Sequence, residues 1–537
     1  MVGRRKRNIF SGEMSQSSIY LGFDFSTQQI KCVAIDEELN FVCENAVRFD
    51  TDLPEFKTNG GVHIHDDNVT VTAPTALWVK ALDLLLFRMQ NGLFDFTYVK
   101  GISGCGQQHG SVFWAKGAKK ALNKLKPVAS LHDQLKDQFS IPDSPVWMDA
   151  STDAQCKRLE DSVGGPMKLA EITGSRAFVR MTGNQIMKIS QTQPEAYANT
   201  ERISLVSSFV PSILIGDYSP IDLSDGSGMN LLDVNTKTWS QKCLDACGEN
   251  LGDKLGQPVP SHTVVGNICS YFCDKYGFPD HCKVVAFTGD NPSSLAGLSP
   301  RVGDVIMTMG TGDAMILWLT EWKPVLVGNA YINPVHSDQY YCLVGFKNGS
   351  LERESIKDKC AGTWEKFEEM FNSTPMGNRG NFGLYFDQVE VQPFIQGTFR
   401  FNEKNEKVDS FPPEVEVRAI LEGQMVARRV YSEMRGMKIT PQTRLIATGG
   451  ASHNQAILQV LADVFNASVY TTDITDSAAL GGCYRAIHAI TGKSFEEAVK
   501  NHPEPVCVAK PTAGCVEVYD KMCERYRMIE KLITNSS

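Results

Sequence analysis

Two stretches of this chain follow the same pattern, one in each half. They are YLGFDFSTQQIKCVAID at residues 20–36 and VIMTMGTGDAMILW at residues 305–318. Each pattern predicts two strands joined by a turn of small residues, in which backbone N–H groups can surround an anion without obstruction by Cβ atoms. One phosphate-holding hairpin in each half predicts a nucleotide held between two related domains. The alternative is a pair of ordinary hairpins, because short Gly/Thr turns are common.

Length and composition agree with a two-domain enzyme. The chain has 537 residues, and a single hydrophobic core stops growing at about 250–300 residues. Apolar residues make up 42% and charged residues 21%, which is usual for a globular enzyme. The net charge of −9 argues against nucleic acid or an anionic membrane as a partner, because both favour a basic surface. The chain has no apolar segment of about 18 or more uncharged residues, so we expect no transmembrane helix.

The first 17 residues contain the one basic run, Arg4–Arg7, next to several serines. We predict that residues 1–17 are a disordered tail, with a targeting fragment as the alternative. No secretory signal is recognised.

Fifteen cysteines are scattered through apolar stretches. The closest pairs, Cys243/Cys247 and Cys269/Cys273, lack the second Cys/His pair that a zinc site needs nearby. We therefore expect reduced, mostly structural thiols and a cytoplasmic location.

Strands and helices alternate along the chain, which predicts the α/β class. Residues 115–142 predict a surface helical insertion, and residues 51–74 and 347–400 predict irregular segments. A boundary at Pro300 gives a first domain at residues 18–299 and a second at 300–537. Apolar spacing predicts three strands within 18–50, further strands at 98–103, 283–288 and 443–448, and helices at 76–89, at 415–434, from 454 and after 516.

The run GCGQQHG at residues 104–110 follows a predicted strand. It matches a dinucleotide-binding turn poorly, because the last Gly comes one place late and no acid for a ribose is evident. His109 at a strand end suits hydrogen bonding to a polyol; a structural histidine is the alternative. The chain contains neither a P-loop nor a protein-kinase catalytic loop.

Two further junctions carry polar groups. Asp290 and Asn291 follow a buried strand directly, at the edge where open α/β sheets bind ligands. Asp290 could accept a hydroxyl proton, and the alternative is an N-cap of the next helix. The run GGASHN at residues 449–454 joins a strand to a helix, and its small residues leave room for a ring or ribose. Gly481 and Gly482 predict close helix packing near the same cleft.

Together these segments resemble the FGGY carbohydrate kinase family, in the actin and hexokinase-like superfamily, over about residues 18–500. Within that family the similarity is greatest to xylulose kinases of the animal type. The order of the motifs matters more than any one of them. The motifs are Asp24-Phe-Ser26-Thr27-Gln28-Gln29-x-Lys31, Gly106-Gln-Gln-His109-Gly110, Trp147-Met-Asp149, Gly289-Asp290-Asn291, Gly310-Thr311-x-Asp313 and Gly449-Gly450-Ala451-Ser-x-Asn454.

The resemblance implies two ribonuclease-H-like domains that close over ATP, Mg²⁺ and a sugar. It implies an ATP-dependent phosphorylation of D-xylulose to D-xylulose 5-phosphate, and we expect a monomer. Asp290 matches the catalytic base, and the sugar contacts are His109, Arg180, Asp290 and Asn291. The expected ATP site comprises Asp24, Ser26, Thr27, Gln28, Gly310, Thr311, Trp364, Gly449, Gly450, Ala451 and Asn454, with Asp24 also near Mg²⁺.

Three positions depart from the family pattern: Ser26 replaces a frequent Gly, Gly312 a usual Ser, and Gln185 a common Trp. Losing the hydroxyl at position 312 could remove one phosphate hydrogen bond, on the order of 1 kcal/mol. The alternatives are a kinase for another sugar or polyol (ribulose, gluconate or glycerol), an actin-like or chaperone ATPase, and a non-catalytic sugar-binding regulator.

Overall fold

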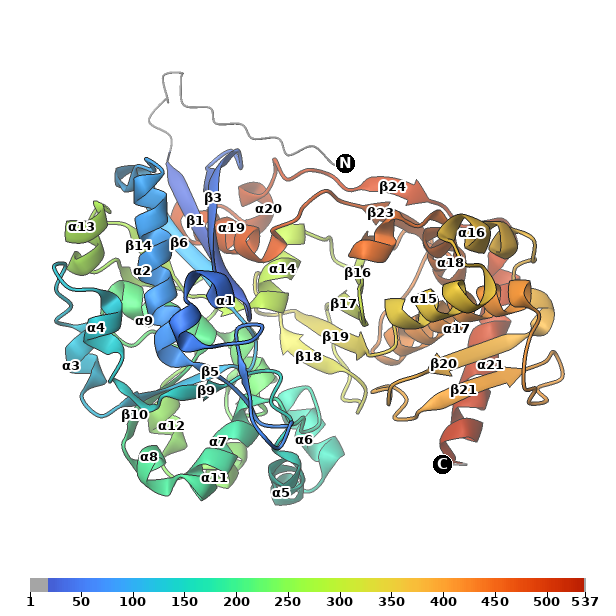
Figure 1. The fold of residues 1–537 in the computed structure, drawn as a ribbon, viewed down its shortest axis with the longest axis horizontal. Helices are drawn as coiled ribbons and strands as arrows, with labels where there is room; N and C mark the ends of the chain where they lie inside the picture. Colours follow the sequence, from blue (N-terminus) through green and yellow to red (C-terminus); the bar gives the residue numbers. More distant parts are fainter. Residues whose placement is uncertain (1–17, 536–537) are drawn as a thin grey trace.

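The computed structural model describes residues 18–535, so the predicted tail at residues 1–17 lies outside the described residues. The chain forms two lobes, each built on a seven-stranded mixed sheet (Figure 1). The first sheet has the order β13-β14-β6-β1-β2-β3, and β15 also pairs with β6. Its strands are β1 (Ile19–Phe25), β2 (Gln29–Asp36), β3 (Phe41–Arg48), β6 (Val99–Gly106), β13 (Val264–Asn267), β14 (Lys283–Val285) and β15 (Thr288–Gly289).

The second sheet has the order β18-β19-β17-β16-β22-β23-β24. In both sheets a run of antiparallel strands leads to two parallel strands and ends in an antiparallel edge strand. The two hairpins at residues 20–36 and 305–318 had predicted two related domains, and the sheets share this topology. The strands are β16 (Val305–Met309), β17 (Asp313–Leu319), β18 (Asn329–Ile332), β19 (Tyr340–Phe346), β22 (Arg444–Thr448), β23 (Ser468–Thr471) and β24 (Val506–Ala509).

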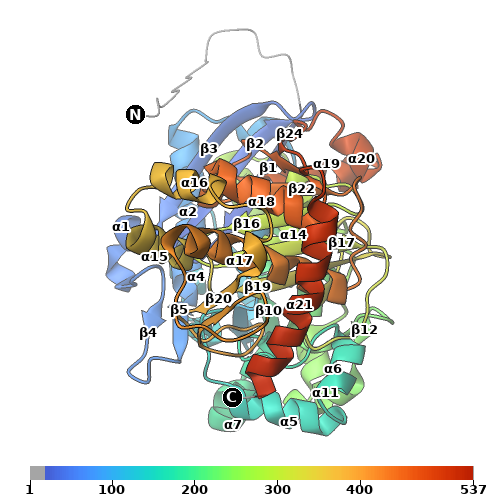
Figure 2. The same ribbon diagram turned by 90° about the vertical axis from the view of Figure 1, so that its right-hand side faces the viewer.

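Amphipathic helices cover each sheet. In the first lobe α2 (Thr75–Asn91) buries Leu77 and Trp78 in the apolar core that it shares with the sheet. In the second lobe α17 (Pro413–Met434), α18 (Gln455–Phe465) and α21 (Cys515–Asn535) pack on one another, and Figure 2 shows α21 along the near side of that lobe. No helix within residues 18–535 is long and apolar enough to span a bilayer.

Two helices cross where the lobes meet, α14 (Asp290–Leu298) from the first half of the chain and α19 (Ser477–Thr491) from the second. A Cβ on Gly481 would lie 1.8 Å from Ser293 O, and one on Gly297 would lie 1.8 Å from Ser477 O. Only glycine permits this approach, so the close packing predicted at Gly481 is confirmed. Helix α19 also packs on β1 and β6, which ties the second half of the chain to the first sheet.

The remaining elements of the first lobe pack around the sheet, and several of them enclose a separate apolar core. They are α1 (Phe49–Asp52), η1 (Pro54–Phe56), β4 (His63–Ile64), β5 (Val71–Pro74), η2 (Phe96–Tyr98), β7 (Ser111–Ala115), α3 (Ala118–Leu122), α4 (Leu131–Leu135), β8 (Phe139–Ile141), β9 (Asp143–Pro145), α5 (Asp153–Val163), α6 (Pro166–Thr173), α7 (Thr182–Thr192), α8 (Pro194–Ala198), β10 (Thr200–Leu205), α9 (Val206–Ile215), α10 (Leu223–Gly226), η3 (Ser227–Met229), β11 (Leu232–Asp233), β12 (Thr238–Trp239), α11 (Gln241–Cys247), α12 (Leu251–Leu255) and α13 (Ser270–Tyr276).

The prediction of an irregular segment at residues 347–400 was wrong. This segment holds two helices and the first strand of a hairpin. The first helix is highly charged and buries only one apolar side chain, Ile356, so its periodicity is weak. The second helix is amphipathic and buries Phe367 and Phe371, so its pattern was present in the sequence and was overlooked. The elements are α15 (Ser350–Cys360), α16 (Trp364–Asn372), η4 (Asn378–Gly380), β20 (Phe382–Phe386) and β21 (Gly397–Phe401); η5 (Gly450–His453) and α20 (Phe495–Ala498) complete the second lobe.

Candidate active site

The first hairpin turn follows Asp24, near the carboxyl end of β1. Ser26 Oγ donates to Asp24 Oδ2 at 2.7 Å, and the Cys105 thiol donates to Asp24 Oδ1 at 3.3 Å. Burial raises the pKa of Asp24 despite these bonds. Thr27 Oγ1 accepts from the Trp147 indole at 2.9 Å, while Gln28 is exposed. The polar side chains of this turn are therefore fixed by neighbours in the same lobe.

Asp290 is the first residue of α14, and the N-cap position belongs to Gly289. The N-cap alternative for Asp290 is therefore wrong. Its Oδ1 accepts from Asn291 N at 2.8 Å and from Asn291 Nδ2 at 3.1 Å. Burial, and then the charge of Asp24, raise the pKa of Asp290 to about 7. A carboxylate with a pKa near the working pH is suited to general base catalysis.

Behind Asn291 lies a buried polar chain whose members Gln108 and Asp225 were missed as site residues. Asn291 Nδ2 donates to Gln108 Oε1 at 2.8 Å, and Gln108 Nε2 donates to Asp225 Oδ1 at 3.5 Å. Ser207 Oγ donates to Asp225 Oδ2 at 2.6 Å. These hydrogen bonds use the amide nitrogen of Asn291, so its Oδ1 can accept from a ligand. The only sequence signal at Asp225 was an Asp in a turn-rich region, which is not specific.

His109 and Arg180 lie in the same lobe. His109 Nδ1 lies 3.1 Å from Gly228 O and donates to it, because a carbonyl oxygen can only accept. In the neutral ring Nε2 is then the acceptor. Burial and then the nearby Arg180 charge lower the pKa of His109 to about 3, which keeps the ring neutral. The Arg180 guanidinium lies 4.8 Å from the Phe178 ring centroid and 5.4 Å from that of Trp147. Its buried Nε has no hydrogen-bond partner within residues 18–535.

A cavity of about 580 Å³ opens in the second lobe between the second hairpin, α15, α16 and η5. Six of the predicted ATP residues line it: Gly310, Thr311, Trp364, Gly450, Ala451 and Asn454. Gly449 lies beneath, where a Cβ would be 2.4 Å from Met309 O, whereas no described atom lies within 4 Å of a Cβ at Gly450. The wall at Gly450 is therefore open to a ligand. Asp24, Ser26, Thr27 and Gln28 do not line this cavity.

The second hairpin is held by a buried ion network. Arg353 donates to both Asp313 oxygens at 2.9 and 3.0 Å, and Arg428 donates to Oδ2 at 2.9 Å. Although burial opposes ionisation, these two arginines lower the pKa of Asp313. A Cβ at Gly312 would lie 2.6 Å from Phe346 O. The backbone packs closely at this turn, so a side chain at position 312 would require the turn to shift.

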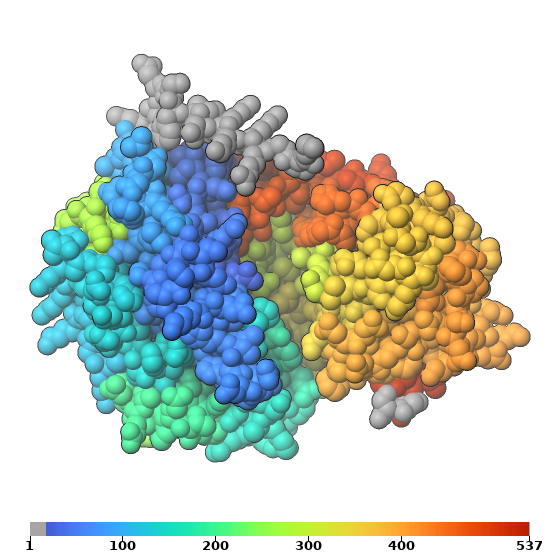
Figure 3. Space-filling model, in the orientation of Figure 1, coloured from blue at the N-terminus to red at the C-terminus, as the bar shows by residue number. Residues whose placement is uncertain are grey.

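Asp24, His109, Asp290 and Asn291 lie at or just after the carboxyl ends of first-sheet strands. Arg180 comes from the segment between α6 and α7 and lies close enough to His109 to lower its pKa. Six of the nucleotide candidates line a cavity in the second lobe. Figure 3 shows the surface hollowed between the two lobes. Asp24 and Asp290 are close enough for one charge to shift the pKa of the other. The arrangement can hold a hydroxyl beside Asp290 and a nucleotide on the facing lobe.

The chain matches the N-terminal domain of the FGGY family of carbohydrate kinases over residues 136–297 and the C-terminal domain over residues 305–490. It belongs to this family, whose members are ATP-dependent sugar kinases. It is 55% identical to the xylulose kinase of Rattus norvegicus over 521 residues, which cover 96% of this chain and 97% of that one. It is 44% identical to xylulose kinase 2 of Arabidopsis thaliana over 487 residues, covering 88% and 87%.

The fold is similar to that of a ligand-bound xylulose kinase from Lactobacillus acidophilus, with a TM-score of 0.77 at 16% identity, over 96% of this chain and 98% of that one. The predicted α/β class with two domains is confirmed. Membership of a carbohydrate kinase family favours an enzyme over the actin-like alternative. The predicted boundary at Pro300 falls between the two matched regions.

Proposed function

We propose that this protein transfers the γ-phosphoryl group of ATP to D-xylulose, giving D-xylulose 5-phosphate. The observation that carries the proposal is Asp290, a half-buried carboxylate with a pKa near 7, held by Asn291 at the end of a first-lobe strand. The identity to mammalian and plant xylulose kinases supports D-xylulose as the acceptor.

Asp290 accepts the proton of the attacking hydroxyl and orients its oxygen. Phosphoryl transfer passes through a loose transition state, so positioning and charge stabilisation matter more than covalent chemistry. His109 Nε2 accepts from one sugar hydroxyl and Arg180 donates to another oxygen. Asn291, whose amide donates to Gln108 and Asp290, accepts from a third.

The nucleotide lies in the second-lobe cavity. The adenosine end contacts Gly450, Ala451 and Asn454, and Trp364 forms part of the same wall. The phosphates extend towards the turns of the two hairpins, at Gly310–Thr311 and at Ser26–Gln28, whose backbone N–H groups suit anions. Approach of the lobes excludes water, which would otherwise compete as the acceptor.

Asp24 would contact Mg²⁺ held mainly by the ATP phosphates. Mg²⁺ commonly uses one or two carboxylates together with phosphates and water, and a single partly exposed carboxylate at the first hairpin fits that pattern. No cluster of three His, Cys, Asp or Glu side chains that could cage a metal occurs within residues 18–535. When bound, the ion neutralises phosphate charge. A cytoplasmic location is supported by the fifteen cysteines, which are all free.

An ADP-release assay with D-xylulose, ribulose, gluconate, glycerol and no sugar tests the proposal. We expect the highest kcat/KM with D-xylulose and only slow ADP release without sugar. A higher kcat/KM for another acceptor would reassign the substrate. Equal rates with and without sugar would indicate an ATPase, and sugar binding without any ADP release would indicate a non-catalytic regulator.

A further inference from the structure

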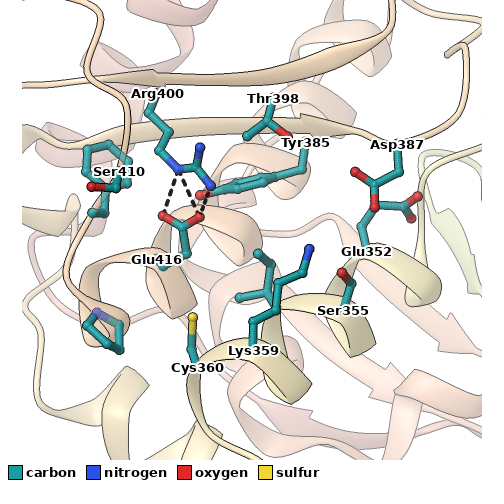
Figure 4. Close-up of a pocket in the computed structure, with 13 residues that line it drawn as sticks. Glu352, Ser355, Lys359, Cys360, Tyr385, Asp387, Thr398, Arg400, Ser410 and Glu416 are labelled. Atoms are coloured by element: carbon teal, nitrogen blue, oxygen red, sulfur yellow. Dashed lines mark hydrogen bonds and ion pairs between the residues drawn. The ribbon is translucent and has the colours of Figure 1, made fainter.

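A second cavity, of about 170 Å³, lies in the second lobe between α15, the β20–β21 hairpin and the start of α17 (Figure 4). Helix α15 separates it from the nucleotide cavity. Leu351, Arg353 and Glu354 line the nucleotide cavity. An adjacent face of the same helix lines the second cavity. Its residues are spaced three or four apart, as expected for one side of a helix, and they are Glu352, Ser355, Ile356, Lys359 and Cys360. None of the residues proposed to bind sugar or ATP lines this second cavity.

Glu352 is a buried carboxyl group with unused hydrogen-bonding capacity. It is 3% exposed, and its Oε2 has no hydrogen-bond partner within residues 18–535. Burial, and then the charges of Asp387 and Glu390, raise the pKa of Glu352 to about 7, although Arg353 opposes the shift. Glu390 is itself occupied, since it accepts from the backbone N–H groups of Lys347 and Asn348. A buried polar group without a partner is costly and calls for a ligand or water.

The other charged groups of the wall largely neutralise one another. Arg400 Nε donates to both Glu416 oxygens at 2.9 and 3.0 Å, as Figure 4 shows. The Arg400 guanidinium also lies 5.5 Å from the centroid of the buried Tyr385 ring. Lys359 is exposed on the outer turn of α15. The Glu352 and Asp387 end of the cavity is therefore acidic, and Ile356 and the Tyr385 ring provide apolar surface.

We propose that this cavity binds a small organic ammonium compound, whose –NH₃⁺ group donates to Glu352 and Asp387 while its apolar part packs on Ile356 and Tyr385. The volume suits the size, because an engineered apolar cavity of about 150 Å³ holds benzene. An anion is disfavoured by the two carboxylates. A divalent metal is disfavoured because no third acidic, His or Cys ligand joins them among the described residues.

Helix α15 links this cavity to the nucleotide cavity. Glu352 precedes Arg353, which holds Asp313 at the second hairpin. Occupancy therefore changes the KM for ATP and leaves that for D-xylulose unaffected. This coupling rests on the proposed kinase function, whereas ligand binding itself does not.

Benzylamine is a suitable probe, with benzyl alcohol as a neutral control of nearly the same shape. Saturation-transfer NMR titrations on the full chain should give a benzylamine Kd at or below about 10 mM and no binding of benzyl alcohol at that concentration. Affinity should rise roughly fivefold to tenfold from pH 6 to pH 8, because the Glu352 carboxylate forms as the pH passes about 7. Ordinary exposed carboxylates, already ionised at pH 6, would give no such change.

Glu352→Gln should weaken benzylamine binding more than about tenfold and abolish the pH dependence. Asp387→Asn, at an exposed position that tolerates substitution, should also weaken binding. Asp358→Asn is the control on the same helix, because this carboxylate is exposed and pairs with Lys357. It should change neither the benzylamine affinity nor its pH dependence. The proposed site would be overturned if benzyl alcohol bound as tightly as benzylamine, or if benzylamine affinity did not change with pH. It would also be overturned if the Glu352→Gln and Asp387→Asn variants both bound benzylamine with unaltered affinity. An unchanged ATP KM at saturating benzylamine would overturn only the coupling, and absence of kinase activity would leave the binding result intact.

Discussion

At the residue scale, the surroundings of Asp290 suit it to its proposed role as the base. Asp290 is half-buried at the start of α14, and desolvation together with the nearby Asp24 charge raises its pKa to about 7. Asn291 and Gln108 hold its orientation through hydrogen bonds that end at buried Asp225. His109 stays neutral because it is buried next to Arg180. A base, neutral acceptors and one cation are thus held together in the first lobe.

Asp290→Asn should nearly abolish phosphorylation while D-xylulose affinity stays within roughly tenfold. The amide keeps the size and some hydrogen bonds of the carboxylate but cannot accept the hydroxyl proton. Steady-state kcat and sugar binding by calorimetry measure the two effects. A kcat within a few-fold of the wild-type value would remove Asp290 as the base.

The pH dependence of kcat/KM for D-xylulose should show one acidic limb near pH 7. Asp290 acts as a base only when deprotonated, and its pKa is raised to about 7, so activity is present above that pH and is lost below it. His109, with a pKa of about 3, should contribute no limb between pH 5 and 8. A limb near pH 4, the range of an ordinary carboxyl group, would contradict the assignment.

His109→Ala and Arg180→Ala should each raise KM for D-xylulose more than KM for ATP. Losing a hydrogen bond to a neutral hydroxyl costs about 1 kcal/mol, and a charge-assisted one about 1.5–3 kcal/mol. These values correspond to roughly fivefold to a hundredfold in affinity. The ratio of the two KM changes is the informative quantity. Folded variants that shift only the ATP KM would place the sugar elsewhere.

At the element scale, glycines decide how closely elements approach one another and the ligand. Gly481 and Gly297 let α14 and α19 cross in contact, and Gly449 lets η5 approach β16. Gly450 differs, because its missing side chain faces open space in the nucleotide cavity. Gly449 and Gly450 are adjacent in sequence, but the first permits close packing and the second leaves room for a ligand.

Gly450→Val should weaken ATP binding by about tenfold or more and leave D-xylulose affinity unchanged. A Cβ at this position meets no described atom within 4 Å, so we expect the variant to fold, while the branched side chain occupies the space proposed for the nucleotide. Calorimetric titration with ATP and with D-xylulose separates the two. Unaltered ATP affinity in the folded variant would move the adenosine site.

Gly481→Val should lower the free energy of unfolding by about 3 kcal/mol or more, since overpacking of a tight interface has costs of this order. A Cβ there lies 1.8 Å from backbone atom Ser293 O, which cannot rotate away. Denaturant unfolding measures the effect. Gly345→Val, where no described atom lies within 4 Å of the Cβ, is the matched control and should change stability by less than about 1 kcal/mol. Equal stability of the two variants would contradict the packing argument.

At the scale of the whole molecule, one apolar core joins the two lobes. It combines Tyr20 and Val33 of the first sheet with Ile306 and Ile316 of the second, around α14 and α19. Arg485 of α19 is fully buried and donates to Ala286 O at 2.8 Å, next to the strand that precedes Asp290. The lobes are thus joined at α14 and α19, close to the base, and the hollow between them is where the two substrates would meet (Figure 3).

Local sequence patterns were enough to predict the duplicated fold and to nominate most of the candidate residues. Strand periodicity and small turn residues are local properties, so the hairpins at residues 20–36 and 305–318 were recognisable without tertiary information. The Gly450–Asn454 junction, Asp290 and His109 were readable for the same reason.

The environment of these residues follows from tertiary contacts, which local sequence patterns do not specify. The pKa of Asp290 depends on burial and on Asp24, which is distant in sequence, and the partners Gln108 and Asp225 meet Asn291 only after folding. Helix α15 escaped prediction because its few apolar positions give a weak period, and packing against α17 stabilises it. The pattern of α16 is amphipathic, so that helix could have been predicted from the sequence. Likewise, α19 joins the first sheet although it follows a strand of the second, because the apolar surface that it buries is created by chain segments more than half the molecule away.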